Sequence, residues 1–531
     1  MSGTLVEEPR LIPESLERER VRVPVLSAPQ VRDPLNLRSS RACAGLVCTV
    51  GLVFLFFSTR PLGQTDTWGH LVYGRAIWQS QSLPTTEPLL LLAQGMPFVD
   101  TAWLNQLIGF GVISLRGVAG LQSLYAASIA VCVALLAWRS YRSSRNGSAA
   151  AYAILAFLVV AWESLTVIHA QLAGLVCFVA LLARFTGRRT HASDWLLVPV
   201  LFAAWANLHV SFVLGLSLLA CFAVGRALDM LRRTGSLQLT IRDDRVRRYF
   251  LLLELAAVAV LLNPYGPNLY AEALSFSSNP NLRELTEWKP LSLQTFAGQM
   301  FVLMVVLLAM IYRWSPRRVR SWEVLALVGF GVASMWSSGN LIWWAPVAAL
   351  LVAQHAYAAL RAFQHLPFVP KPVPRRAIWS LVMIGGLGFC FAYSPLGGRL
   401  LSGKEAELKR TISDDTPVAA AEYLKANPPQ GLVFNVYEWG DHLQWAGPPG
   451  IEVFVNSHVH LLPLDVWQRY LQILDQRGNW EEVLDRFAVN SMVLNTRRQG
   501  PLVFKLKRQT EVWKLAFEQD GQIVFVRRNP L

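Results

Sequence analysis

A series of apolar runs, separated by short charged loops, limits this chain to few folds. A hydrocarbon core about 30 Å thick is crossed by roughly 17–25 apolar residues in a helix. The composition agrees, because 53% of the 531 residues are hydrophobic and only 16% are charged, against about 25% in a typical soluble domain. We predict an α-helical polytopic membrane protein with about eleven transmembrane helices, near residues 42–58, 118–138, 149–162, 170–185, 195–206, 209–225, 249–262, 298–312, 322–336, 340–360 and 377–394.

The segment 103–117, WLNQLIGFGVISLRG, differs from these runs. It is apolar on one side and too short to span a bilayer. We predict an amphipathic helix that lies on the membrane surface.

The distribution of Lys and Arg predicts the orientation. If the N-terminus is cytoplasmic, the inner loops hold 21 basic residues and the outer connections hold 5. Basic residues stay on the cytoplasmic side of a membrane. The net charge of +14 is therefore explained by orientation, and we expect no nucleic-acid partner.

Three regions follow from this organisation. Residues 1–41 are Pro-rich, of mixed charge and without apolar periodicity, which predicts a disordered cytoplasmic tail. Residues 42–394 form the transmembrane domain, with a long first outer loop at 59–117. Residues 395–531 have 16 basic and 16 acidic residues and alternate helix-like with strand-like segments, which predicts an extracytoplasmic α/β domain. None of the six Cys falls in this domain, so we expect no disulfides there.

The first outer loop carries the main candidates for chemistry. Asp66 and His70 are four residues apart in GQTDTWGHLVYGRAIWQ, and on a helix they share one face with Tyr73. The same loop adds Glu87, Asp100 and Trp103. Three carboxylates are a plausible supply for acid/base work. The alternative for Asp66 is a helix cap or a loop carboxylate.

Further polar residues gather at the other predicted outer edges. They are Glu163, His169, Gln171, Asn207, His209, Asn263, Tyr265, Glu284, Glu287, Trp288, Lys289 and Asn340. Polar groups at membrane depth tend to face a cavity or a pathway. For each single His, a structural hydrogen bond is the alternative.

These stretches resemble the GT-C glycosyltransferase superfamily. DTWGHLVYGRAIWQ…GMPFVDTAWLNQ is similar to its first outer loop, and HAQLAGLV, WANLHVSFVLGL, LLNPYG, LTEWKPLS and the tail motif VFNVYEWGDHLQWAGPPGIEVFVNSHVHLLP occur in the order of one GT-C-like bacterial family. The resemblance runs from about residue 60 to the C-terminus. It implies a multi-span helical fold, a surface helix in the first outer loop, an extracytoplasmic α/β domain, and sugar transfer from a polyprenyl-phosphate sugar. Asp66 matches the position of the usual catalytic base.

The chain also departs from the family pattern. It has Trp68-Gly69 where a double Trp is common, Ala102 where an acid precedes Trp103, HAQ in place of Arg-Pro-Gln, and Asn456 to His458 in place of Asp-Gly-Arg. Either the substrate differs or this member has lost catalysis.

The predicted function is that of a membrane glycosyltransferase in a bacterial inner membrane, which moves a sugar from a polyprenyl-phosphate donor to an envelope glycan, lipid or protein acceptor. Asp66, Asp100 and Glu87 are the catalytic candidates, and the substrate-binding candidates are His70, Arg75, Trp103, His169, Gln171, Asn207, His209 and Lys289. No cofactor is predicted with certainty. A divalent metal on the three carboxylates would suit the chemistry, although no ligand spacing marks one. The alternatives are a catalytically degenerate relative that acts in binding or assembly and, ranked lower, a transporter.

Overall fold

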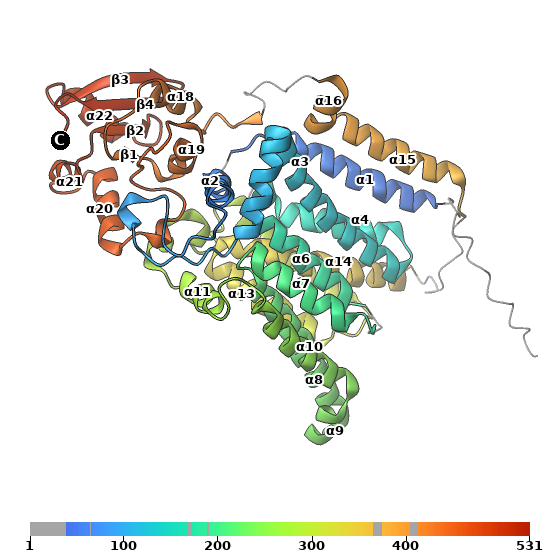
Figure 1. The fold of residues 1–531 in the computed structure, drawn as a ribbon. Helices are drawn as coiled ribbons and strands as arrows, with labels where there is room; N and C mark the ends of the chain where they lie inside the picture. The colour runs from blue at the N-terminus through green and yellow to red at the C-terminus, as the bar shows by residue number, and fades with distance from the viewer. Residues whose placement is uncertain (1–38, 64, 168–170, 188–190, 365–373, 404–410) are drawn as a thin grey trace, which may run out of the picture.

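The structure is a computed structural model that describes residues 39–63, 65–167, 171–187, 191–364, 374–403 and 411–531. The predicted N-terminal tail lies outside the described residues, except for its last three. Helices dominate the first three quarters of the chain (Figure 1). They are α1 (Arg41–Ser58), α2 (Thr65–Ser80), α3 (Trp103–Ser144), α4 (Gly147–Val160), α5 (Trp162–Thr166), α6 (Gln171–Phe185), α7 (Asp194–Leu208), α8 (Phe212–Thr234), α9 (Leu237–Arg242), α10 (Asp244–Val260), α11 (Asn268–Phe276), α12 (Phe296–Trp314), α13 (Ser321–Trp336), α14 (Leu341–Phe363), α15 (Ala377–Ala392) and α16 (Pro395–Ser402).

Short 3-10 turns lie in the loops between these helices. They are η2 (Leu91–Ala93), η3 (Pro280–Glu284), η4 (Thr286–Trp288) and η5 (Ser338–Asn340).

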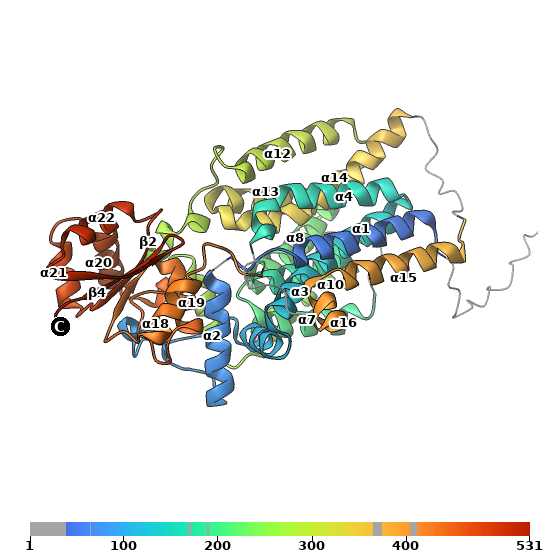
Figure 2. The same ribbon diagram turned by 90° about the horizontal axis from the view of Figure 1, so that it is seen from above.

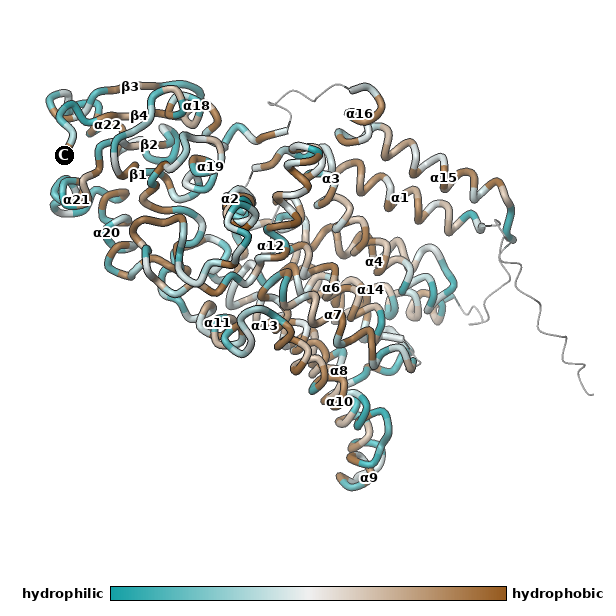
Figure 3. Tube along the Cα trace, in the orientation of Figure 1, coloured by the Kyte–Doolittle hydropathy of each residue, from teal (hydrophilic) through white to brown (hydrophobic). Residues whose placement is uncertain are grey.

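Each of the eleven predicted spans falls on a helix of this bundle. Within the described residues, five helices are long and apolar enough to cross a membrane, or six if α15 and α16, which meet at a bend of 83°, count as one span. Four shorter apolar helices accompany them. The hydropathy colouring shows mainly apolar residues along the helices of the bundle, and a mixture of polar and apolar residues at the tip formed by α9 (Figure 3). The number of eleven crossings and their orientation stay predictions.

Helix α3 contains a break at the point where the sequence predicts a surface helix to end. Gly117 has φ 64° and ψ −163°, a conformation that side chains other than glycine rarely adopt. The Arg399 guanidinium of α16 donates to the Arg116 carbonyl at 2.6 Å, beside this break. The segment from Trp103 to Arg116 is thus a helix with its own direction, which packs against α2.

The C-terminal unit follows α16 and mixes helices with a small sheet. Its elements are α18 (Val418–Ala426), β1 (Val433–Asn435), α19 (Tyr437–Ala446), η6 (Val459–Leu461), α20 (Leu464–Leu474), α21 (Trp480–Arg486), β2 (Ser491–Asn495), α22 (Gly500–Arg508), β3 (Trp513–Gln519) and β4 (Gln522–Arg527). The strand order is β1-β2-β4-β3, with β1 parallel to β2 and the other pairs antiparallel. Asp520-Gly521, both with positive φ, form the tight turn between β3 and β4.

The C-terminal unit lies at one end of the helical bundle, with α2 between the two (Figures 1 and 2). Its hydrophobic core is shared with the loops of the bundle. Side chains from residues 59–117 and from the α11–α12 connection pack in one cluster with the sheet. We call this cluster the shared core: Tyr73, Leu90, Phe98, Leu282 and Leu285 together with Phe434, Phe454, Met492 and Phe525. The two parts are therefore joined through buried apolar contacts.

Candidate functional site

A cavity of about 480 Å³ opens where the loop 59–117, the helical bundle and the C-terminal unit meet. Five of the candidates predicted from the sequence line it: Asp66, His70, Asp100, Gln171 and His209. Glu287, Trp288 and Asn340, which the sequence analysis places at the predicted outer edges, line it as well. The structure adds further polar and aromatic residues: Gln106, Ser211, Glu272, Phe276, Trp343, Ser457, His458 and His460. Residues distant in the sequence thus converge on one space.

Asp66 and His70 reach this cavity from the first two turns of α2. A carboxylate in the first turn of a helix is stabilised by the positive end of the helix dipole. The helix is held beside α19, where the rings of Trp68 and His442 meet edge to face at 4.9 Å between centroids. The predicted helical pairing of Asp66 and His70 is confirmed, and both side chains are partly buried.

Asp100 is the most buried carboxylate of the cavity wall, with 2% of its surface exposed. Its Oδ1 accepts hydrogen bonds from the Ala102 backbone N–H at 3.0 Å and from Gln106 Nε2 at 2.9 Å. Its Oδ2 is buried and has no hydrogen-bond partner within the described residues. Burial raises the pKa of Asp100 to about 7, because the charged form loses its hydration. This carboxyl group can therefore exchange a proton near neutral pH.

Glu87 does not line the cavity. Both carboxylate oxygens accept from the Tyr73 hydroxyl, at 2.8 and 2.9 Å, and Oε1 also accepts the backbone N–H groups of Leu89 and Leu90. Burial raises the pKa of Glu87. In this structure the residue closes the turn after α2 and fixes Tyr73 beside it.

The cavity wall does not include four other candidates: Arg75, Trp103, Asn207 and Lys289. Arg75 donates to the carbonyls of Gln444 and Trp445 at 2.7 and 3.2 Å, at the C-terminal end of α19. Trp103 Nε1 donates to Asn207 Oδ1 at 2.9 Å, which ties α3 to the end of α7. Lys289 is exposed to solvent. His169 lies outside the described residues.

His209 and Gln171 bring the bundle into the site. His209 follows α7, and its Nδ1 accepts the Ser211 backbone N–H at 3.1 Å. Gln171 is the first residue of α6. The start of α6 and the end of α7 thus both reach the cavity wall.

The segment from Asn456 to His460 is one part of the site that the sequence candidates omit, and α11 with Glu272 and Phe276 is another. His458 lies 6.2 Å from His70 and 5.5 Å from His460, between ring centroids. Burial, then the neighbouring His460 and His70, lowers the pKa of His458 well below its usual range. Burial lowers the pKa of His460 to about 4. The double His of NSHVH is visible in the sequence, but only the fold places it against α2.

Asp441 of α19 holds the segment from Asn456 to His460 through a hydrogen bond to its backbone. It is fully buried, and its Oδ2 accepts the Ser457 backbone N–H at 3.1 Å. Burial, with the negative charges of Asp66 and Glu87 adding to it, raises the pKa of Asp441 to about 8. At neutral pH this carboxyl group is mostly protonated.

The described residues contain no group of three or more His, Cys, Asp or Glu that could hold a metal ion. The carboxylate of Glu87 is hydrogen-bonded to Tyr73 and to backbone N–H groups, and it does not line the cavity. Glu87 therefore does not join Asp66 and Asp100 in one set of metal ligands. The arrangement does not fit the divalent metal considered from the sequence, and we derive no step through one.

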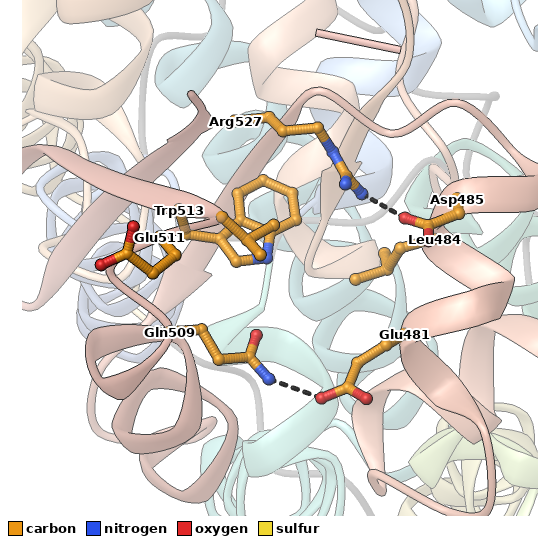
Figure 4. A pocket seen from close by; sticks show the side chains of 8 residues that line it. Glu481, Leu484, Asp485, Gln509, Glu511, Trp513 and Arg527 are labelled. Atoms are coloured by element: carbon orange, nitrogen blue, oxygen red, sulfur yellow. Dashed lines mark hydrogen bonds and ion pairs between the residues drawn. The ribbon is translucent and has the colours of Figure 1, made fainter. Parts of the chain in front are cut away.

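A second cavity, of about 390 Å³, lies on the C-terminal unit between α21, the end of α22 and the β3–β4 hairpin (Figure 4). Its polar side chains bind one another: Arg527 pairs with Asp485 at 2.6 Å, and Gln509 donates to Glu481. None of the candidates from the sequence lies there. The cavity at the junction is therefore the candidate functional site.

Comparison with known proteins shows what the fold of this chain is similar to. The sequence matches no protein-family model and no curated protein. The fold is similar to that of the oligosaccharyltransferase of Archaeoglobus fulgidus, solved with a tethered acceptor peptide, with a TM-score of 0.55 and 11% identity over 91% of this chain and 74% of that chain. It is also similar to ArnT of Cupriavidus metallidurans, solved with bound undecaprenyl phosphate, with a TM-score of 0.51 and 14% identity over 92% of this chain and 98% of that chain. Both are GT-C glycosyltransferases, and this chain has the GT-C glycosyltransferase fold.

Proposed function

We propose that the protein transfers a sugar from a polyprenyl-phosphate donor to an acceptor hydroxyl or amide in the cavity at the junction. The observation that carries the proposal is the convergence of Asp66, His70, Asp100 and His209 on one cavity in a chain with the GT-C fold. The bound undecaprenyl phosphate of ArnT supports a lipid-phosphate donor.

Asp66 is the proposed general base. It takes the proton from the acceptor while the acceptor atom forms a bond to the anomeric carbon and the bond from that carbon to the phosphate oxygen breaks. The polyprenyl phosphate leaves with the electrons of the broken bond. A positioned base contributes ~10²–10⁴ to the rate of such a step.

The histidines are the proposed partners of the departing phosphate. His70 of α2 and His209 at the end of α7 both line the cavity, and a lipid phosphate bound there would keep its tail in the bilayer. Donors placed where charge develops stabilise the transition state. Asp100, with a pKa near 7, is a proposed second proton-exchange group.

The proposed setting is a bacterial inner membrane, with the N-terminus in the cytoplasm and residues 395–531 outside it. The excess of Lys and Arg in the loops on one side supports this orientation. The acceptor, whether envelope glycan, lipid or protein, then reaches the cavity from the outer side.

A second function is favoured by one observation. Among the described residues of the cavity wall there is no Lys or Arg, although these residues are the common holders of phosphate. A catalytically inactive protein that binds a lipid-linked sugar, or serves in assembly, would have less need of them.

Incubation of the purified protein with labelled polyprenyl-phosphate sugars and crude envelope acceptors separates these functions. Transfer or hydrolysis that is lost in Asp66→Asn supports the transferase. Donor binding without turnover across the panel supports the binding protein. Absence of both binding and turnover contradicts the two proposals.

A further inference from the structure

The hairpin that α8 and α10 form ends in a tip with exposed apolar side chains. The short helix α9 closes the hairpin and packs against both helices, and Figure 1 shows it projecting from the bundle, away from the C-terminal unit. Leu237, Leu239 and Ile241, which we call the tip aliphatics, expose 63%, 53% and 60% of their surfaces. Exposed apolar patches rimmed by polar residues mark contacts with a protein or a membrane.

Four arginines flank the tip aliphatics. These tip arginines are exposed, and within the described part of the chain none of them forms an ion pair: Arg233, Arg242, Arg245 and Arg247. The segment 231–248 holds six Arg and two Asp, and therefore has a net charge of +4. The apolar patch is thus rimmed by positive charge.

Other arginines of this hairpin are neutralised by the chain itself. Arg226 pairs with Asp243 at 2.9 Å, and Arg248 pairs with Asp194 at 3.1 Å. These pairs hold α10 against α8 and α7. The second acid of the segment, Asp244, is exposed. The positive charge of the tip arginines is therefore available to a ligand outside the chain.

The tip lies near the level at which α8 leaves the bilayer. Helix α8 is long and apolar enough to span a membrane, and Arg226 is its first charged residue. With a rise of about 1.5 Å per residue, its last residue, Thr234, lies roughly 12 Å further along the helix. Any tilt of the hairpin brings α9 closer to the hydrocarbon core, within reach of the lipid headgroups.

We propose that the tip of the α8–α10 hairpin binds anionic lipids of the membrane that holds the bundle. The tip arginines pair with lipid phosphates, which guanidinium groups bind through two hydrogen bonds. The tip aliphatics enter between the headgroups, as the apolar face of an interfacial helix does. Positive charge favours an anionic surface, and the membrane is one that the chain already crosses. None of these residues lines the cavity at the junction, so the contact is separate from the proposed sugar transfer.

Hydrogen exchange in two kinds of nanodisc tests this contact on the full-length protein. One contains phosphatidylcholine alone, and the other contains phosphatidylcholine and phosphatidylglycerol in equal parts. Backbone N–H groups of residues 235–247 should exchange at least roughly tenfold more slowly with phosphatidylglycerol, because a bound α9 opens less often. High salt should reduce this difference, because it screens the charges. Equal exchange in the two membranes would overturn the proposal and leave a protein as the partner of the patch.

Two variants separate the tip from the net charge of the protein. Replacement of all four tip arginines by Gln should abolish the slowing by phosphatidylglycerol. The matched control removes the same charge from exposed positions of the C-terminal unit: Arg469→Gln, Arg486→Gln, Arg497→Gln and Arg508→Gln. This control should keep the parental slowing, and an equal loss in both variants would contradict a contact at the tip.

A third variant tests the tip aliphatics apart from the charge. The triple change Leu237→Ser, Leu239→Ser and Ile241→Ser keeps every arginine, and the slowing by phosphatidylglycerol should fall by several-fold. Exchange in α14, most of which is buried in the bundle, should match that of the parent in all variants and shows that the bundle is folded. Full slowing in the triple variant would overturn the entry of α9 into the headgroup layer.

Discussion

Asp441 of the C-terminal unit lies directly against Gly69 of α2. A Cβ atom placed on Gly69 would stand 2.5 Å from Asp441 Oδ1 and 2.9 Å from Ser457 Oγ. No side chain fits there without a shift. The glycine that follows Trp68 therefore makes room for Asp441. It lies on α2 between the two cavity residues Asp66 and His70, against the segment that carries His458.

Gly69→Ala should separate α2 from α19. Overpacking of a filled site costs roughly 1–3 kcal/mol, and the melting temperature of the purified protein should fall accordingly. Gly111→Ala is the matched control, because nothing lies within 4 Å of its added Cβ. A Gly69→Ala protein as stable as Gly111→Ala would contradict the close contact.

Asp66→Asn should reduce transfer by ~10²–10⁴, the usual loss when a general base is removed. Folding should change little, because a carboxylate in the first turn of a helix contributes about 0.3–1 kcal/mol. The control is Asp415→Asn, which neutralises an exposed carboxylate of the C-terminal unit. If Asp66→Asn transfers sugar at the parental rate, Asp66 is only a carboxylate at the end of a helix and has no part in the mechanism.

Asp100 should make stability fall as the pH rises. Burial raises its pKa from 3.8 to about 7, so the folded protein keeps a proton that the unfolded chain releases between these values. The stability due to this proton is present at low pH and is lost as the pH approaches 7. The effect is at most about 4 kcal/mol.

Unfolding midpoints at pH 5 and pH 8 test this expectation. Asp100→Asn cannot titrate, so its midpoints should differ less between the two pH values than those of the parent. Asp415→Asn should keep the parental difference. If Asp100→Asn keeps it as well, Asp100 ionises at its ordinary pKa.

The Trp103–Asn207 hydrogen bond should act on stability and leave donor affinity unchanged. Trp103→Phe removes the indole donor and Asn207→Ala removes the acceptor. In a double-mutant cycle the coupling should be about 0.5–1.5 kcal/mol, the usual contribution of such a bond. If donor affinity falls while stability holds, the two side chains bind substrate, as the sequence analysis predicts.

A reporter enzyme that is active only outside the cytoplasm, fused after Leu531, tests the orientation. The bias of basic residues predicts that the fusion is active. A fusion in the loop around Ser236, between α8 and α9, should be inactive. The opposite pattern would put the cavity on the cytoplasmic side.

Much of the fold could be predicted because it depends on local patterns. Apolar windows of fixed length located the helices, and the switch to alternating segments after Pro395 located a region with a sheet. The break at Gly117 follows the point where the amphipathic segment ends. These features depend on residues a few positions apart, which the sequence displays directly.

Only part of the site could be predicted, because the remaining residues are brought to it by contacts between segments that are distant in the sequence. Asp66 and His70 share a helix, so their spacing was sufficient. His458 reaches them across nearly four hundred residues, and nothing in NSHVH indicates its neighbour. Glu87 shows the reverse case: its carboxylate looks available in the sequence, but the nearby Tyr73 hydroxyl occupies it.

The shared core has a consequence for how this protein could be re-engineered. Leu282 and Leu285 of the bundle loops are buried against the same cluster as Phe434 and Phe454. A tail grafted from a relative would meet foreign side chains at that contact, even if its own sheet were intact. Chimaeras should fold stably only when the loop 280–288 and the segment 87–98 are exchanged together with the C-terminal unit. The part that must be exchanged as a whole is therefore discontinuous in the chain.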